Sequence, residues 1–194
     1  MLRSHTCGEL NKDDIEQQVK LSGWVHSRRD HGGIIFIDLR DRYGFTQVVF
    51  DPSHDSENYH IAEALKREYV IQISGKVRAR KEGTENPNLI TGEIEVLTDY
   101  LQILSESDTP PIEIDDRVHV NEDLKLKYRY LDLRKTEMQK NIKTRHDTVQ
   151  SVRRFLHDNS FMEIETPVLA RSTPEGARDY LVPSRVHSGQ FYAL

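Results

Sequence analysis

The stretch Val19–Val25 reads Val-Lys-Leu-Ser-Gly-Trp-Val, and its pattern decides the fold of the N-terminal half. Apolar or small residues stand at every second position, with Lys, Ser and Trp between them. A period of two residues is typical of a β-strand that is buried on one face. Working outward, similar strand patterns follow over residues 33–39, 45–50, 69–79 and 93–104.

The strands expected over 45–50 and 69–79 are separated by a segment with helical spacing, Ser56–Glu68. Ile61, Ala62 and Leu65 fall on one side of the expected helix, and Ser56 is the expected N-cap. Three strands, a helix and two strands over about a hundred residues fit a five-stranded Greek-key barrel of the OB-fold type. Another small barrel or a sandwich also fits this order. The fold class is therefore mainly β, with an α+β extension.

The extension begins after an acidic connector. Residues 105–123 hold Thr109-Pro110-Pro111 and seven acidic residues against one arginine. A short helix is expected over Leu124–Arg134, followed by a long amphipathic helix over Glu137–Asp158. Phe161–Ile164 is expected to be a strand that ends at Pro167, which has no backbone N–H to donate. We expect a barrel over 1–104, a linker over 105–136 and a further domain over 137–194.

Composition excludes several classes of protein. The net charge of −5 argues against a protein that coats nucleic acid indiscriminately, although basic residues cluster locally. No apolar run approaches the roughly 20 residues needed to span a bilayer, and the N-terminus lacks a secretion signal. One cysteine cannot form an internal disulfide and fits a cytoplasmic protein. The nine histidines show no metal-ligand spacing, so we expect no metal site.

Phe36 is predicted to lie on the outward face of the barrel, where polar residues are expected. An exposed aromatic ring can stack on a nucleic-acid base, a contact worth about 1–3 kcal/mol. Arg28 and Arg29 precede it, and Gln47 and Glu95 lie on later strands with side chains that can read an unstacked base. The alternative is an aromatic ring tucked under a loop beside a solvated set of charges.

Four segments along the chain carry a resemblance to a known family. The barrel and the junction after it resemble those of class IIb aminoacyl-tRNA synthetases, and residues 173–181 resemble the substrate-binding loop of the bacterial aspartyl enzymes. The segments are Gly23-Trp24-Val25 with Arg28-Arg29-Asp30; Ile35-Phe36-Ile37-Asp38-Leu39-Arg40-Asp41 with Gln47-Val48-Val49-Phe50; Tyr128-Arg129-Tyr130-Leu131-Asp132-Leu133-Arg134; and Thr173-Pro174-Glu175-Gly176-Ala177-Arg178-Asp179-Tyr180-Leu181.

The resemblance implies roles for particular residues. The ring matching Phe36 would stack on the middle anticodon base, within a set that contacts the anticodon of tRNA(Asp). A glutamate matching Glu175 would help to hold the ammonium group of L-aspartate from a mobile loop. The helix over 137–158 would build a homodimer interface, with Pro167 as its proline. The implied anticodon contacts are Arg28, Arg29, Phe36, Gln47, Arg80 and Glu95.

Two loop residues resemble those of enzymes that also charge tRNA(Asn). His31 is expected in the loop between the first two strands and Gly83 in the loop after Arg80. A small or adaptable contact would discriminate less at the third anticodon base, which differs between the two tRNAs. Alternatively, both are neutral loop residues.

The family implies an aspartate–tRNA ligase that uses ATP and Mg²⁺. The chain reaches Leu194 before any of the expected ATP-binding arginines or metal carboxylates, so we expect it to be inactive alone and to bind neither cofactor. Two alternatives stay open. The chain could be a stand-alone nucleic-acid-binding barrel, or a non-catalytic relative that uses the long helix only for dimerisation.

Overall fold

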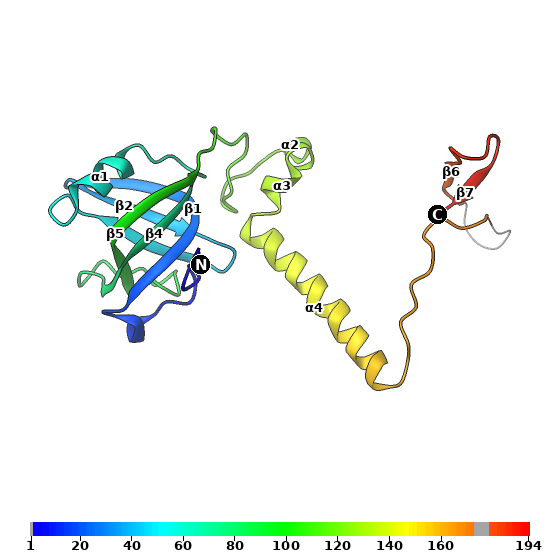
Figure 1. The fold of residues 1–194 in the computed structure, drawn as a ribbon, viewed down its shortest axis with the longest axis horizontal. Coiled ribbons are helices and arrows are strands. Elements are labelled where there is room, and N and C mark those ends of the chain that lie inside the picture. Colours follow the sequence, from blue (N-terminus) through cyan, green and yellow to red (C-terminus); the bar gives the residue numbers. More distant parts are fainter. Residues whose placement is uncertain (1, 173–178) are drawn as a thin grey trace. The chain divides into compact units, whose positions relative to one another are not determined.

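The computed structural model describes residues 2–172 and 179–194, and it divides into two compact units, Met1–Met138 and Gln139–Leu194. The first unit contains a closed barrel with strand order β1-β2-β3-β5-β4 (Figure 1). Its strands are β1 (Gln18–His31), β2 (Ile34–Arg40), β3 (Phe45–Phe50), β4 (Val70–Ala79) and β5 (Ile94–Ser105). The pairing is antiparallel except between β3 and β5, which run parallel. The predicted five-stranded barrel is confirmed.

Alternation along the strands fills the interior of the barrel. Ile35, Ile37 and Leu39 on β2 are fully buried, whereas Phe36 and Asp38 between them are only partly covered. The same inward positions on the other strands complete a single apolar core, and they include Val19, Leu21, Val25, Val48, Phe50, Ile71, Ile73, Val77, Ile94 and Val96. At these positions, the inward-facing residues inferred from the sequence therefore match the structure.

Helix α1 (Ser56–Glu63) is shorter than the segment expected to be helical, and it starts from a different cap. The N-cap is Asp55, whose side chain accepts from the backbone N–H groups of Glu57 and Asn58, so the choice of Ser56 was wrong. The helical spacing continues to Glu68, but this residue has a left-handed backbone (φ 65°) and donates its N–H to the carbonyl of Val25 at 2.8 Å. The chain therefore leaves the helix after Glu63 and is hydrogen-bonded to the barrel at Glu68.

Strand β1 is longer than predicted. It continues through a bulge between Val25 and Ser27 and ends at His31, so His31 lies at the end of a strand and not in a loop. The two-residue turn to β2 is Gly32-Gly33, with φ values of 63° and 77°. Positive φ at both central positions is what a tight hairpin turn of this type requires, and glycine adopts it without steric cost.

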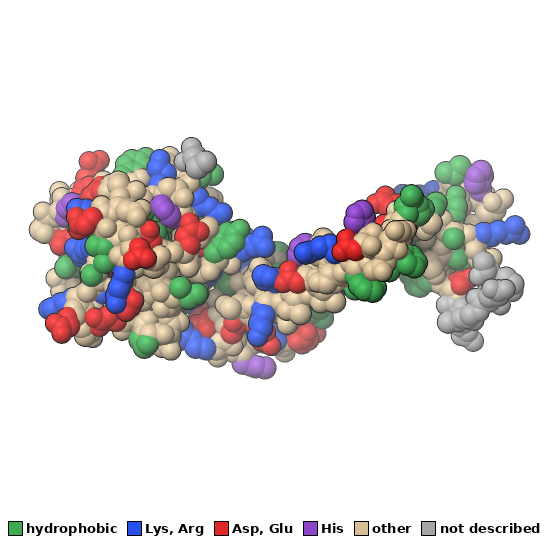
Figure 2. Space-filling model, turned by 90° about the horizontal axis from the view of Figure 1, so that it is seen from below, with side chains coloured by type: hydrophobic (Ala, Val, Ile, Leu, Met, Phe, Trp, Pro, Cys, Tyr) green, Lys and Arg blue, Asp and Glu red, His purple; other side chains and the backbone are tan. Residues whose placement is uncertain are grey.

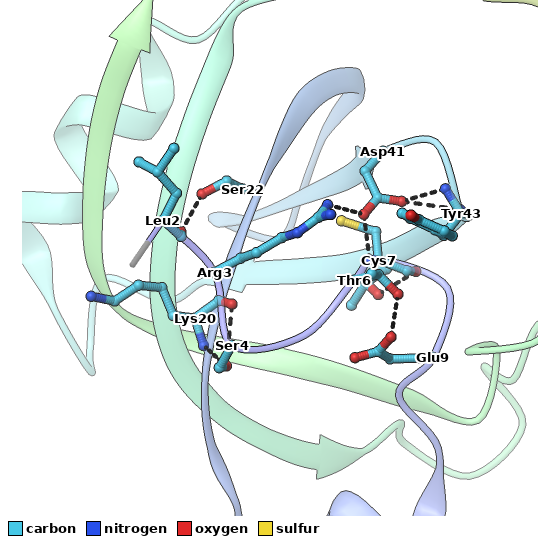
Figure 3. Close-up of polar contacts among 12 residues, drawn as sticks. Leu2, Arg3, Ser4, Thr6, Cys7, Glu9, Lys20, Ser22, Asp41 and Tyr43 are labelled. Atoms are coloured by element: carbon cyan, nitrogen blue, oxygen red, sulfur yellow. Dashed lines mark hydrogen bonds and ion pairs between the residues drawn. The ribbon is translucent and has the colours of Figure 1, made fainter.

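Residues 2–10, here called the N-terminal strap, are tied to the barrel by hydrogen bonds to Lys20 and Ser22 and by the Asp41 carboxylate (Figure 3). Asp41 Oδ2 accepts from Arg3 Nη1 at 3.1 Å and from the Cys7 N–H at 3.0 Å. Its Oδ1 accepts from the N–H groups of Tyr43 and Gly44 at 2.7 and 3.1 Å. The strap was not expected from the sequence, because its anchors lie on β1 and on a turn more than thirty residues away.

The connector after the barrel is folded and packs within the first unit. It contains α2 (Glu122–Lys127) and α3 (Arg129–Asp132) in place of the one short helix expected over 124–134. The helices are separated at Tyr128, whose ψ of 45° departs from helical backbone. A second apolar cluster forms here from Ile112, Ile114, Val120 and Leu131, with Tyr128 packed against it. The 3₁₀ turn η1 (Lys12–Asp14) completes the unit.

The second unit holds most of α4 (Thr136–Asp158) and a two-stranded sheet of β6 (Leu181–Pro183) and β7 (Phe191–Ala193). Phe161–Ile164 is not a strand, so that prediction was wrong. A strand needs a partner for its backbone groups, and none of the described strands pairs with this segment. Within the described residues, no helix is both long enough and apolar enough to cross a membrane.

Candidate functional site

Phe36 is displayed on the outer wall of the barrel. It pairs in register with Arg29 on β1 and with Val49 on β3. Its side chain is partly exposed and lies outside the apolar core formed by the inward residues on either side of it. A flat apolar surface is therefore available beside the polar side chains of the neighbouring strands.

A continuous chain of polar contacts crosses all five strands beside Phe36. Arg29 Nη2 lies 2.7 Å from Asp38 Oδ1 and 3.4 Å from Gln47 Oε1. Gln47 Nε2 donates to Glu95 Oε2 at 2.8 Å, and Arg78 Nε donates to Glu95 Oε1 at 2.8 Å. We call Arg29, Asp38, Gln47, Arg78 and Glu95 the polar chain.

The polar chain fixes the orientation of the Gln47 amide. Its nitrogen faces the Glu95 carboxylate, which can only accept, and its oxygen faces the Arg29 guanidinium, which can only donate. Flipping the amide would place oxygen against oxygen and nitrogen against nitrogen. Gln47 and Glu95 are 8% and 6% exposed, so solvent cannot readily compensate such a clash. The remaining N–H and lone pair of Gln47 therefore have set directions.

Arg80 lies close to the polar chain and holds an unused donor. Its Nε donates to the carbonyl of Ile94 at 3.0 Å, but its buried Nη2 has no hydrogen-bond partner among the described residues. The residue is 9% exposed, and burial lowers the pKa of its guanidinium, while nearby Glu95 and Asp38 oppose that shift. An unpaired buried donor is costly, so an acceptor atom from a ligand would be stabilised here.

The other residues proposed from the sequence lie elsewhere. Arg28 pairs with Ile37 and so faces the opposite way from Arg29, toward the region of Tyr59 on α1. Burial raises the pKa of Tyr59, and the charge of Arg28 opposes part of that rise. His31 is exposed at the hairpin tip, and Gly83 is exposed in the loop after Arg80 with φ 81°. Pro167 is exposed in the second unit, and Glu175 lies outside the described residues.

Asp38 and Arg78 were missing from the residues proposed from the sequence, yet they hold the two ends of the polar chain. Arg78 could have been found from strand alternation, since it stands between Lys76 and Arg80 on the outward face. The contact with Glu95 could not, because it joins two strands whose register the sequence does not give.

The charges at this site nearly balance. Arg29, Arg78 and Arg80 stand against Asp38 and Glu95, and on the face of the first unit seen in Figure 2 basic and acidic side chains are interspersed. Such a surface suits selective hydrogen bonding better than indiscriminate attraction of polyanions. Among the described residues, no group of three or more His, Cys, Asp or Glu side chains is placed to hold a metal ion.

Two family models match the chain. Residues 19–104 match the OB-fold nucleic acid binding domain called tRNA anti-codon, and residues 121–194 match the class II tRNA synthetases of the D, K and N group. The first match covers the whole barrel wall that carries Phe36 and the polar chain.

Similar proteins point the same way. The chain is 56% identical over 99% of its length to an aspartate–tRNA(Asp/Asn) ligase of Protochlamydia amoebophila and, at the same identity and coverage, to an aspartate–tRNA ligase of Bacillus licheniformis. It spans 32% and 33% of those proteins, about a third of their length.

A solved structure shows the same fold. The asparaginyl-tRNA synthetase of Pyrococcus horikoshii in complex with asparaginyl-adenylate aligns with a TM-score of 0.83 at 24% identity, covering 100% of this chain and 43% of that one.

Proposed function

We propose that the chain is the tRNA-reading part of an aspartate–tRNA ligase, and so a member of the class II tRNA synthetases of the D, K and N group. The barrel binds the anticodon of tRNA(Asp), and the residues from about 137 onward begin the catalytic domain. The high identity to aspartate–tRNA ligases along nearly the whole chain supports the amino acid specificity.

One observation carries the proposal: a partly exposed ring stands beside an amide of fixed orientation and a buried guanidinium donor that has no partner among the residues the structure describes. An unpaired base presents a flat face and an edge with donors and acceptors. Phe36 supplies the stacking surface, and Gln47 supplies one donor and one acceptor in set directions. Arg80 Nη2 supplies a further donor for a base or phosphate oxygen.

The experiment measures binding of an RNA hairpin with the aspartate anticodon loop to the 194-residue chain. Phe36→Ala should weaken binding by about 1–3 kcal/mol, roughly fivefold to more than a hundredfold in Kd. Tyr100→Ala is the matched control, since Tyr100 is an exposed aromatic on β5, five residues beyond Glu95 and outside the polar chain. Equal affinities for wild type and Phe36→Ala would refute the proposed reading of the anticodon.

A second function follows from the relatives. The Protochlamydia protein is a tRNA(Asp/Asn) ligase, whereas the Bacillus licheniformis protein is named as an aspartate–tRNA ligase without that breadth. We propose that this barrel accepts the anticodons of both tRNA(Asp) and tRNA(Asn), with exposed His31 and Gly83 as adaptable contacts. Comparing hairpins that differ in the third anticodon base, for wild type and His31→Leu, tests this. An unchanged ratio of affinities would remove His31 from the explanation.

The complete ligase would join L-aspartate to tRNA with ATP, and membership of the family supports the use of ATP. Mg²⁺, the role of Glu175 toward the aspartate ammonium and the homodimer with Pro167 at its interface remain parts of the proposal. The described residues of this chain supply no cluster for Mg²⁺, so no step is assigned to the ion here. A cytoplasmic location is also part of the proposal, and it rests on the resemblance to the tRNA ligases. Sedimentation of the complete ligase, with Pro167→Ala for comparison, tests the dimer.

A further inference from the structure

A separate surface that carries two arginines lies on the barrel at the turn between β2 and β3. Arg3 of the N-terminal strap and Arg42 of the turn both place their guanidinium carbon 5.5 Å from the centre of the Tyr43 ring. Tyr43 is 54% exposed, and Arg42 is exposed as well. Figure 3 shows Arg3 and Tyr43 converging at Asp41 from two different segments of the chain. We call Arg3, Arg42 and Tyr43 the strap surface.

The strap surface is held in place by buried groups. Asp41 is 8% exposed and accepts four hydrogen bonds, from the Arg3 side chain and from the N–H groups of Cys7, Tyr43 and Gly44. Gly8 packs so closely that a Cβ there would lie 2.2 Å from the carbonyl oxygen of Tyr43. The strap and the turn are thus locked together, which lowers the entropy cost of presenting these side chains to a ligand.

The two arginines differ in what neutralises them. Arg3 forms an ion pair with Asp41 at 3.1 Å, but Arg42 has no carboxylate within ion-pair distance among the described residues. A guanidinium that contacts an aromatic ring can leave N–H donors at its edge free. Those donors form a planar fork that matches a phosphate group.

We infer that the strap surface binds phosphate groups of the RNA backbone, outside the bases that Phe36 and the polar chain read. This rests on the proposed function of the barrel and extends it along the same strand. Phe36, Asp38 and Arg40 occupy alternate positions on β2, and Arg42 follows two residues later. The four residue steps from Phe36 to Arg40 are extended and span about 13 Å. The turn carries Arg42 beyond the end of the strand, which places the strap surface away from the stacked base.

A phosphate contact has a signature that base reading lacks. Removing one such contact weakens binding equally for matched and mismatched sequences and reduces the slope of log Kd against log salt by about 1. Loss of a base-reading contact instead reduces discrimination between sequences. The two sites can therefore be tested separately in one set of titrations.

The test uses the 194-residue chain and two RNA hairpins, one with the aspartate anticodon and one with a mismatched middle base, over about 50 to 200 mM KCl. Arg42→Gln should weaken both hairpins alike. The ratio of its Kd to that of wild type should fall about threefold to fourfold across this salt range. Arg42→Lys should restore most of the salt slope but less of the affinity. Arg3→Gln should act in the same direction as Arg42→Gln.

Arg117→Gln is the matched control. It removes the same charge from an exposed arginine that pairs with Asp115 in the connector, and it should leave the slope unchanged. A wild-type slope for Arg42→Gln, with an unchanged thermal unfolding curve, would overturn the inference even if Phe36→Ala still weakens binding. If wild type binds neither hairpin, the proposed function itself fails and the inference falls with it. Binding of an acidic peptide in place of RNA would assign the surface to a protein partner.

Discussion

Arg40 Nη2 lies 2.9 Å from both carboxylate oxygens of Glu68, and both side chains are more than nine-tenths buried. Arg134 of the connector reaches toward the same carboxylate at 3.8 Å. Both arginines also lie over the ring of Trp24, at 5.9 Å for Arg40 and 4.8 Å for Arg134. The buried Glu68 carboxylate therefore helps to hold the connector against the barrel. Glu68 also has a left-handed backbone, a conformation that persists only where the surrounding structure holds the residue firmly.

Glu68→Ala should lower the free energy of unfolding by about 3–5 kcal/mol, because it leaves the Arg40 guanidinium buried without its counter-ion. Urea unfolding followed by circular dichroism measures this. Glu63→Ala removes an exposed acid that pairs with His60 and should change stability by less than about 0.5 kcal/mol. Similar losses of unfolding free energy in the two variants would show that the buried ion pair contributes no more to stability than the exposed one.

Glu95→Gln should reduce base discrimination more than overall RNA affinity. The neutral amide no longer compels Gln47 to present its nitrogen to residue 95, so the amide can reverse. The difference in binding free energy between matched and mismatched hairpins should shrink by about 1–3 kcal/mol, the usual contribution of a base-reading contact. Glu93→Gln on the same chain segment, an exposed acid that contacts Lys12, is the control. Retention of full discrimination by Glu95→Gln would mean that the polar chain does not orient Gln47.

His26 should contribute to loss of stability in acid. Burial and the charge of Arg40 lower its pKa below the ordinary 6.5, against smaller opposite effects of Asp38 and Asp115. Its Nδ1 lies 2.9 Å from Arg40 Nη1 and can accept that hydrogen bond only when unprotonated. The unfolded chain binds this proton more readily, so the contribution is present above about pH 6.5 and is lost as the pH falls below it.

His26→Gln should therefore lose less stability than wild type between pH 7 and pH 5, since an amide oxygen can accept from Arg40 without titrating. Chemical denaturation at each pH gives the comparison. Equal pH dependence in both proteins would exclude His26 as the titrating group. The acidic groups whose pKa values are lowered by hydrogen bonds, such as Asp55, remain in both proteins and cancel in the difference.

Asp55→Ala should cost about 0.5–2 kcal/mol, because two N–H groups at the start of α1 lose their acceptor. Ser56→Ala, the position that the sequence pattern favoured, should be nearly neutral. Thermal unfolding of the two variants decides between the caps. A larger loss for Ser56→Ala would contradict the observed capping.

The barrel could be predicted because strand alternation is local. Ile35 and Ile37 point inward and Phe36 outward whatever lies beyond the strand, and the order of the elements then limits the topology. The site could be predicted only in part. Phe36, Gln47 and Glu95 stood out by residue type, but the link from Arg78 to Glu95 depends on the pairing of β4 with β5.

Other features were out of reach for related reasons. The contact of Asp41 with Cys7 joins segments distant in the chain, so no local pattern announces it. Phe161–Ile164 has a strand's composition, but strand formation requires a neighbouring edge, and periodicity cannot say whether one is present. The helix start was placed one residue late because Asp55 and Ser56 are both good caps and only geometry separates them.

The position of Trp24 offers a practical benefit. It is the single tryptophan of the chain, and its ring is flanked by one arginine from the barrel and one from the connector. Tryptophan fluorescence, excited selectively over that of the eight tyrosines, therefore arises from the contact between barrel and connector, so loosening of the connector can be followed in real time without attaching a dye.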